Sequence, residues 1–324
     1  MTWVQGLWAV DGNTLDASVW RQQLYSATLK KSGIMAPTDL KVTAFGTPGA
    51  GVNVAGGSCV IAGQELSAGQ QGSYFGFNNG TDTVSVAATG GSPRNDLICA
   101  RVEDPTFSGS PWTWNPATQN LIYSRDISGV AGGTTNVPAG TTGIPLALLT
   151  IPASTSAITN AMITDLRQLV NPIRQTDLYV LTPVAIDSMV VGTDSKTVYR
   201  NWGPSFPAVV IPTWAVTMRV VFMVAATAVG GGTYGVSVAI QLKIGSSIFS
   251  QPGGIGDPGA GPNNTGYNAT GMLGDNINVS SLQGQTVIVQ PQARIANIAN
   301  VQGSMTINTW STLTLQCHFL EAPQ

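Results

Sequence analysis

The sequence predicts a mainly β protein built from two β domains, and three observations lead to this prediction. Only one segment carries the full set of helix signals. The other apolar segments are short, rich in β-branched or aromatic residues, and separated by turns that contain Gly, Pro or Asn. The segment Thr312–Phe319 (TLTLQCHF) alternates strictly between apolar and polar residues, as a strand with one buried face does.

The predicted helix spans residues 17–31, where Trp20 and Leu24 lie on one face. Short strands separated by Gly-rich turns follow it, and Asn79-Gly80 between two of them predicts a tight hairpin. We therefore expect residues 1–168 to form a sandwich-like or barrel-like β domain that carries this one helix.

A break in the pattern separates this domain from a second series of strands. Pro172 cannot donate to a β ladder and restricts the residue before it, so we expect a linker at residues 169–176. Residues 177–324 are predicted to form an antiparallel β-sandwich of the jelly-roll type. Within it, residues 251–276 are dense in Gly, Pro and Asn, which predicts a long loop of functional importance.

Charge is scarce in this chain. It has 14 Lys and Arg and 16 Asp and Glu in 324 residues, a net charge of −2, which argues against binding to nucleic acid. The longest apolar stretch, Val216–Val229, is shorter than the roughly 20 residues of a membrane helix and contains Arg219, so we expect no membrane insertion. So few repelling charges favour self-association, and we expect a homo-oligomer.

The titratable residues predict neither an active site nor a cofactor. The single His318 excludes zinc sites built on several histidines. Many of the aspartates stand beside Gly, Pro or Asn, as turn residues do, and no pair of acidic residues is close enough in sequence to indicate acid–base catalysis. Calcium remains an alternative in residues 251–276. The oxygens available there belong to Asp257, Asn263, Asn264, Asp275 and Asn276.

The three cysteines, Cys59, Cys99 and Cys317, are an odd number in apolar surroundings, so we expect them to be reduced and buried. A bridge between Cys59 and Cys99 is the alternative. The N-terminal residues lack the basic region and apolar run of a signal peptide, so we expect a protein that is not exported by the usual route.

Aromatic residues beside Asn, Gly and Thr are the candidates for ligand binding. Exposed Trp and Tyr rings in such surroundings suit sugar rings, which need apolar contact and neutral hydrogen bonds. The alternative is that these rings anchor turns to the core or fill contacts between subunits. The candidate glycan-binding residues are Tyr267, Trp202, Trp214, Trp310, Asn264 and Asn268.

Several blocks in the first half occur in a recognisable order. They include Ile34–Thr43 (IMAPTDLKVT), Val52–Gly57 (VNVAGG), Pro93–Ile98 (PRNDLI) and Ile163–Arg167 (ITDLR), after a short Trp- and Gly-containing start and a helix. This first half resembles the N-terminal domain of minor tail and baseplate proteins of long-tailed bacteriophages, especially those that infect actinobacteria. The second half contains no block that matches.

The resemblance implies a structural part of the virion at the tail tip, assembled in the host cytoplasm and not an enzyme. The first domain would dock to other tail-tip proteins and the chain would form a homotrimer. The second domain would then be a receptor-binding head for a cell-wall or surface glycan, or a further structural layer; a glycan depolymerase is the third alternative. The residues expected at the oligomer or attachment surface are Trp3, Trp8, Trp20, Asp165, Leu166 and Arg167.

Overall fold

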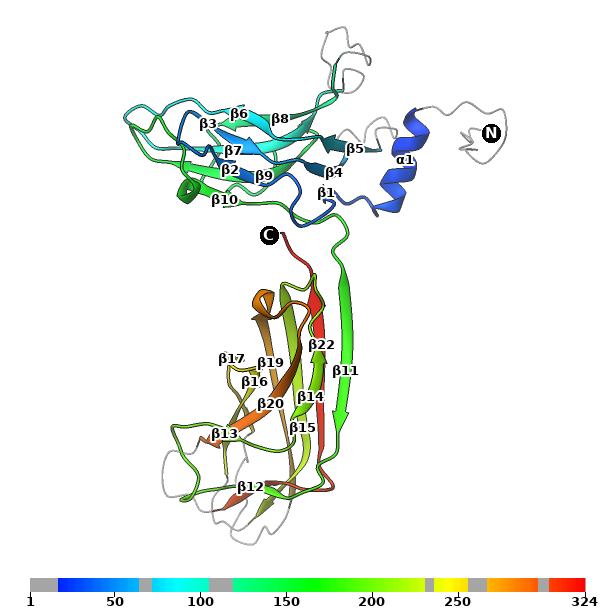
Figure 1. Cartoon of the computed structure of the whole chain (residues 1–324), viewed down its shortest axis with the longest axis vertical. Coiled ribbons are helices and arrows are strands. Elements are labelled where there is room, and N and C mark those ends of the chain that lie inside the picture. The colour runs from blue at the N-terminus through cyan, green and yellow to red at the C-terminus, as the bar shows by residue number, and fades with distance from the viewer. Residues whose placement is uncertain are drawn as a thin grey trace, which may run out of the picture. The chain divides into compact units, whose positions relative to one another are not determined.

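The computed structural model describes residues 17–63, 72–104, 119–230, 236–255, 267–296 and 303–323. The chain divides into two compact units, the first ending at Pro172 and the second comprising Ile173–Ala322. Both are built mainly of antiparallel strands, so the predicted fold class is confirmed (Figure 1). No helix in the described part of the chain combines the length and apolar character needed to cross a bilayer.

The single α-helix, α1 (Ala17–Ala27), belongs to the first unit and ends four residues earlier than the sequence predicts. Leu29 and Lys30 adopt left-handed backbone conformations with φ of 51° and 66°, which stop the helix. The Lys30 N–H then bonds the carbonyl of Tyr25 at 2.9 Å, in the manner of a helix C-terminal cap.

Three antiparallel sheets form the rest of the first unit (Figure 1). Buried aliphatic side chains from all three make one core, which includes Ile34, Val52, Ile98 and Leu149. The first sheet has the order β1 (Gly33–Ile34), β4 (Gly57–Ala62), β5 (Ser73–Asn78), the second β2 (Val42–Ala44), β3 (Gly51–Val54), β6 (Asp82–Ser85), and the third β10 (Ile163–Asp165), β9 (Gly143–Ile151), β7 (Arg94–Val102), β8 (Ile122–Ser128). A short 3-10 helix, η2 (Asn160–Met162), precedes β10.

The hairpin predicted at Asn79-Gly80 does not form. Strand β5 pairs with β4, whereas β6 pairs with β3, so the two strands that flank this turn lie in different sheets. The Asn78 side chain, just before the turn, donates hydrogen bonds to the carbonyls of Val54 and Ala55, on the strand that pairs with β6 and the residue after it. The dipeptide therefore makes the chain cross between sheets, and the pairing is decided by strands far away in sequence.

The expected linker at residues 169–176 is shorter in the structure. Val170 is buried in the first unit and its N–H bonds the carbonyl of Ile34 at 3.0 Å. Residues 174–176 already belong to β11 (Arg174–Leu181), the first strand of the second unit.

The second unit is one continuous antiparallel sheet folded into two layers. One layer has the order β11, β22, β15, β19, and the other has the order β14, β20, β16, β18. Numbering these strands B to I in chain order gives B-I-D-G and C-H-E-F, which is the strand order of a jelly roll. A single pairing, Gly254 with Met272, joins β18 to β19 and links the layers. The predicted jelly-roll arrangement is thus confirmed by the topology.

The strands of this unit differ widely in length. After β11 come β12 (Asp187–Val190), β13 (Arg200–Asn201), β14 (Phe206–Val210), β15 (Thr217–Gly230), β16 (Val238–Ile244), β17 (Ile248–Phe249), β18 (Gly253–Ile255), β19 (Tyr267–Asn278), β20 (Thr286–Ile295), β21 (Ser304–Ile307) and β22 (Thr312–Leu320), with the 3-10 helix η3 (Ser280–Leu282) between β19 and β20. Residues 251–276, expected to be a loop, therefore contain β18 and most of β19. The high Gly and Asn content of this segment led to the prediction of a loop where two strands form.

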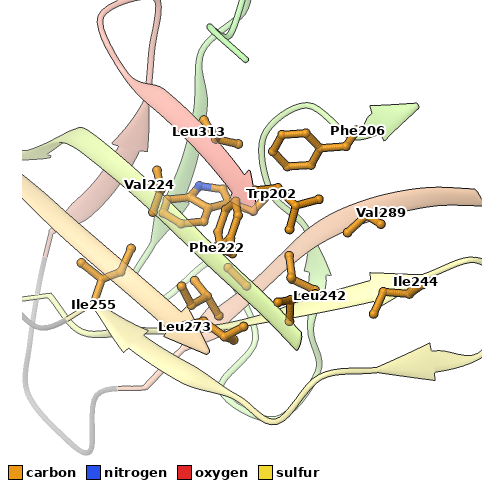
Figure 2. Close-up of a cluster of buried hydrophobic side chains, with 14 of the residues drawn as sticks. Trp202, Phe206, Phe222, Val224, Leu242, Ile244, Ile255, Leu273, Val289 and Leu313 are labelled. Atoms are coloured by element: carbon orange, nitrogen blue, oxygen red, sulfur yellow. The ribbon is translucent and has the colours of Figure 1, made fainter. Parts of the chain in front are cut away.

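Side chains from the facing sides of the two layers make the core of the second unit. Figure 2 shows Trp202 and Phe222 among Val224 and Leu313 of one layer and Leu242 of the other. Strand β22 alternates as its sequence predicts, with Leu313, Leu315, Cys317 and Phe319 all buried.

Candidate functional site

The indole of Trp202 is buried in the core, with 0% of its surface exposed, so it cannot serve as a platform for a sugar. Its Nε1–H donates to the carbonyl of Asp187 at 3.2 Å, and its ring packs against the apolar side chains of both layers (Figure 2). The glycan role expected of Trp202 is therefore wrong. Asn201 and Gly203 flank a ring that points into the core and not toward solvent.

Trp214 is half-buried and packs against the same core. It lies beside Val216, whose N–H bonds the carbonyl of Leu320, and Leu320 pairs with Arg174 at the start of β11. Trp214 is therefore at the end of the second unit where the chain enters from the first unit. This position separates it from the other aromatic candidates.

Trp310 is 84% exposed and stands on a turn held by side-chain hydrogen bonds. Its N–H donates to Asn308 Oδ1 at 2.8 Å, and Ser311 Oγ accepts from the Asn308 N–H at 3.0 Å. Ser311 Oγ–H also donates to the carbonyl of Ala226 at 2.9 Å, which fixes the turn to β15. The sequence Asn-Thr-Trp-Ser thus builds a rigid support that presents an indole ring to solvent.

Strand register places Asn268 at the same end of the second unit as Trp310. Asn268 pairs with Ala228 near the end of β15, and Trp310 precedes Thr312, which pairs with Ala225. We call this end, which is opposite along the strands to Arg174, the distal end. The backbone of Tyr267 also lies here, whereas its side chain and the whole of Asn264 fall outside the described residues.

Arg200 braces the distal end. Its guanidinium donates to Asp194 Oδ1 at 2.6 Å, to Asp187 Oδ1 at 2.9 Å, and to the carbonyl of Ser188 at 2.6 Å. Burial raises the pKa of Asp194, but the hydrogen bonds from Arg200 and from the Val190 N–H outweigh it and hold the pKa below its ordinary value. These contacts hold β12 against the segment that leads to Trp202. The carboxylates of Asp187 and Asp194 are both hydrogen-bonded to Arg200.

The residues expected at the attachment surface of the first unit separate into two groups. The Arg167 guanidinium is buried and bonds both carboxylate oxygens of Asp165, as well as the carbonyls of Pro37 and Asp39. Arg167 is therefore an internal clamp, and the attachment role expected of it is wrong. Asp165 and Leu166 remain partly exposed beside it.

The second group is represented by Trp20, which is 56% exposed on α1. Together with Leu24 of the same helix, Phe75 of β5 and Leu121, it lines an apolar groove of 630 Å³. Trp3 and Trp8, expected at the same surface, lie outside the described residues. The groove is an apolar feature of this unit that the sequence did not predict.

The described residues contain no group of three or more His, Cys, Asp or Glu placed to hold a metal ion. Of the oxygens considered for calcium, Asp275 accepts from the Gln251 N–H at 2.7 Å and Asn276 accepts from Arg219 Nε at 3.0 Å. Asp257, Asn263 and Asn264 lie outside the described residues.

Sequence reasoning missed an apolar surface on the outside of the second unit. Leu178 and Val180 of β11 and Met272 of β19 are each more than half exposed. The segment Leu178–Leu181 (LYVL) is apolar or aromatic at every position, so its sequence does not tell which of its two faces is buried.

Comparisons with known proteins identify no family for this chain. No family model matches it. No curated protein matches it.

Among solved structures, three of infectious bursal disease virus can be superposed on most of the chain, at low similarity. The structure of the Gx strain is 9% identical, covers 91% of this chain and 76% of its own, and has a TM-score of 0.26. The VP2 subviral particle is 10% identical over 90% and 75%, with a TM-score of 0.28. The virus-derived T=1 particles are 10% identical over 91% and 77%, with a TM-score of 0.27. TM-scores this low carry no inference about the function of this chain.

Proposed function

We propose that this chain is a structural protein of a phage virion, positioned at the tail tip or baseplate as a homotrimer, whose second unit contacts a glycan of the host surface. The order of the sequence blocks in the first half supports the virion role. In the structure, the PRNDLI and ITDLR blocks supply ion pairs, Arg94 with Asp96 and Asp165 with Arg167. These blocks therefore support a fold that the resemblance associates with tail attachment.

In this proposal, the first unit attaches to other tail-tip proteins through the apolar groove beside Trp20. The groove is lined by Trp20, Leu24, Phe75 and Leu121, and aromatic side chains of this kind are enriched where proteins bind each other. Arg167 instead maintains the shape of the unit from inside.

The observation that carries the glycan-binding part is the exposed indole of Trp310 on its hydrogen-bonded turn. Because the hydrogen bonds order the main chain of the turn, a sugar that stacks on the ring has little backbone to order on binding, so less of the contact energy is lost. Asn268 at the same distal end offers an amide that donates and accepts neutral hydrogen bonds. The distal end is also opposite to the point where the first unit joins, which suits a surface directed toward a host.

The test is a binding experiment with the full chain and a matched pair of variants. Fluorescently labelled protein is incubated with purified cell-wall polysaccharide from a panel of actinobacteria and with a glycan array. We expect saturable binding that Trp310→Ala weakens at least tenfold, whereas Trp20→Ala, which removes an exposed indole from the first unit, leaves it unchanged. Absence of binding, or equal losses in the two variants, would overturn the glycan-binding part.

A second candidate function is favoured by the apolar outer surface of the second unit. If this unit acts only as a further structural layer, its surfaces contact neighbouring tail proteins and it has no affinity for glycans. A map of the assembled tail tip distinguishes the two functions, because the Trp310 turn would then be buried between subunits rather than directed outward.

A further inference from the structure

The outer face of the β11-β22-β15-β19 layer is divided into a polar part and an apolar part. Near the entry end, Thr176 and His318 share a hydrogen bond of 2.8 Å, and Arg219 donates to Asn276 in the same row. The next two rows across the layer are Leu178, Gln316, Val221, Gly274 and then Val180, Thr314, Met223, Met272. We call these two rows the apolar face; none of their side chains is ionisable.

The opposite outer face of the second unit has a different character. On the layer that contains β16 and β20, Gln241 donates to Gln292 at 2.9 Å, and Gln292 donates to Asn201 at 3.1 Å. This amide row is what an antiparallel sheet shows when one of its faces meets water. This layer also exposes the apolar side chains of Val210, Phe249 and Ile288, but the amide row and Lys243 lie among them. The apolar face instead has five apolar side chains in two adjacent rows.

Strand β11 adds a second feature to the apolar face. It pairs with β22 on one side and has no strand on its other side within the described residues. Leu178 and Val180 are 63% and 57% exposed on this edge. On this face of β11 the charged side chain is Arg174 at the entry end, so the part of the edge that carries Leu178 and Val180 is uncharged. An exposed apolar edge of this kind is a template for association unless something covers it.

The size of the layer matches what a stable contact needs. Strand β11 has 8 residues, so it is about 26 Å long, and four strands spaced about 4.8 Å apart give roughly 500 Å² in projection. Two layers that meet over this whole surface, polar rows included, bury roughly 1,000 Å² in total, the size above which biological interfaces separate from most packing contacts; the apolar face supplies about half of that area. With a net charge of −2, two copies repel each other only weakly.

We propose that copies of this chain associate with one another through the apolar face of the β11-β22-β15-β19 layer. This inference rests on the homo-oligomeric part of the proposed function and gives a location to a contact between two copies; it does not specify the threefold arrangement. It leaves the distal end with Trp310 free for another ligand, so oligomerisation and glycan binding can be lost separately.

Analytical ultracentrifugation of the full chain tests the proposal. The wild-type protein is expected to sediment as an oligomer of its 33.6 kDa protomer, and the double variant Val180→Lys, Met272→Lys as a single protomer. The matched control is Ile288→Lys, which places a lysine at a position of similar exposure, 53%, on β20 of the other layer; it should remain oligomeric. A monomeric wild type, or a double variant that stays oligomeric, overturns the proposal. A monomeric wild type would indicate that the apolar face contacts a different protein.

A cross-linking variant supplies a second readout that does not depend on tolerating two lysines. The native cysteines are all buried, so a cysteine introduced by Met272→Cys is the reactive thiol in the folded protein. A short bis-maleimide should then join protomers into covalent dimers, whereas Ile288→Cys should not. Equal cross-linking by the two variants would also overturn the proposal. The glycan binding of Trp310→Ala is measured separately, so failure of one result does not imply failure of the other.

Discussion

Arg167 Nη1 donates a hydrogen bond of 2.6 Å to the main-chain carbonyl of Asp39, joining segments that are 128 residues apart in the sequence. Asp39 in turn accepts hydrogen bonds on Oδ2 from the N–H groups of Ala36 and Ser58. The ITDLR block and the IMAPTDLKVT block therefore meet in one network. The residues that carry the family resemblance in these two blocks hold the loop before β2 in place.

Substitution of Arg167 by Met should destabilise the first unit by about 3 kcal/mol. It removes the guanidinium from two carbonyls and from the Asp165 carboxylate, which keeps only the main-chain N–H of residue 167 among the donors in the described part of the chain. The matched control is Arg125→Met, which breaks an ion pair with Glu103 in which both side chains are partly exposed. That loss should be about 1 kcal/mol or less. Urea unfolding of the full chain, followed by circular dichroism, measures both; equal losses would contradict the clamp.

Two glycines of β19 should respond differently to alanine. A Cβ at Gly271 would lie 1.9 Å from Cγ1 of the buried Ile255, whereas a Cβ at Gly274 meets nothing closer than 3.8 Å. Gly271→Ala should therefore cost about 1–3 kcal/mol through overpacking, and Gly274→Ala should change stability little. The cost at Gly271 should shrink in an Ile255→Ala background, and a double-mutant cycle by thermal unfolding shows whether it does.

Two tryptophans of the second unit should separate stability from binding. Trp202→Ala empties a large site in the core and should cost about 3–5 kcal/mol. Trp310→Ala removes a ring that is 84% exposed and should change stability by about 0.5 kcal/mol or less. Chemical unfolding of both variants measures this, and a large loss for Trp310→Ala would show that its ring supports the fold rather than a ligand.

Asp126 of β8 should make the first unit less stable as the pH rises. Burial, together with the charge of Asp96 and against that of Arg94, raises its pKa from 3.8 to about 6, and its Oδ1 is buried without a hydrogen-bond partner among the described residues. Between pH 4 and pH 6 the native state keeps a proton that the unfolded state has lost. Deprotonation therefore favours unfolding across this range.

The variant Asp126→Asn removes this titration. Its free energy of unfolding should rise relative to that of the wild type as the pH increases from 4 to 6, with a constant difference below pH 4 and above the native pKa. Urea unfolding at a series of pH values gives the comparison. Parallel profiles for the two proteins would show that Asp126 is solvated like an ordinary aspartate.

The cysteines should be unreactive in the folded protein. Burial raises the pKa of the Cys59, Cys99 and Cys317 thiols to about 12, and all three are free. A thiol reagent such as DTNB at pH 8 should modify none of them in the native state and all three in guanidinium chloride. Detection of two fewer thiols after unfolding without reductant would instead indicate the bridge between Cys59 and Cys99.

Local sequence patterns predicted individual strands better than they predicted which strands pair with each other. The alternation of Thr312–Phe319 identified β22 and its buried face, because a period of two follows directly from strand geometry. Asn79-Gly80 predicted a hairpin that does not exist, since the pairing of β5 and β6 depends on β4 and β3. Leu29 and Lys30 ended the helix at a point that the residue types around them do not mark.

The candidate glycan-binding residues show that local sequence does not predict burial either. Trp202 and Trp310 both follow an Asn by one or two residues in turn-like sequences, yet Trp202 is buried in a core and Trp310 is exposed to solvent. Sequence alone describes the neighbours along the chain, whereas burial depends on which strands fold across a residue. Only the register of β15 with β19 and β22 brings Asn268 and Trp310 to one end.

The amino-acid sequence by itself determined the class of this protein: a poorly charged, mainly β chain with two series of strands, because composition and strand periodicity are local properties. Tertiary structure decided which apolar residues are core and which face outward, as Phe222 is buried on β15 while Leu178 is exposed on β11. The physical reason is that a strand has two faces and an edge. Whether each face and edge is buried or exposed depends on long-range strand pairing, which no local pattern encodes.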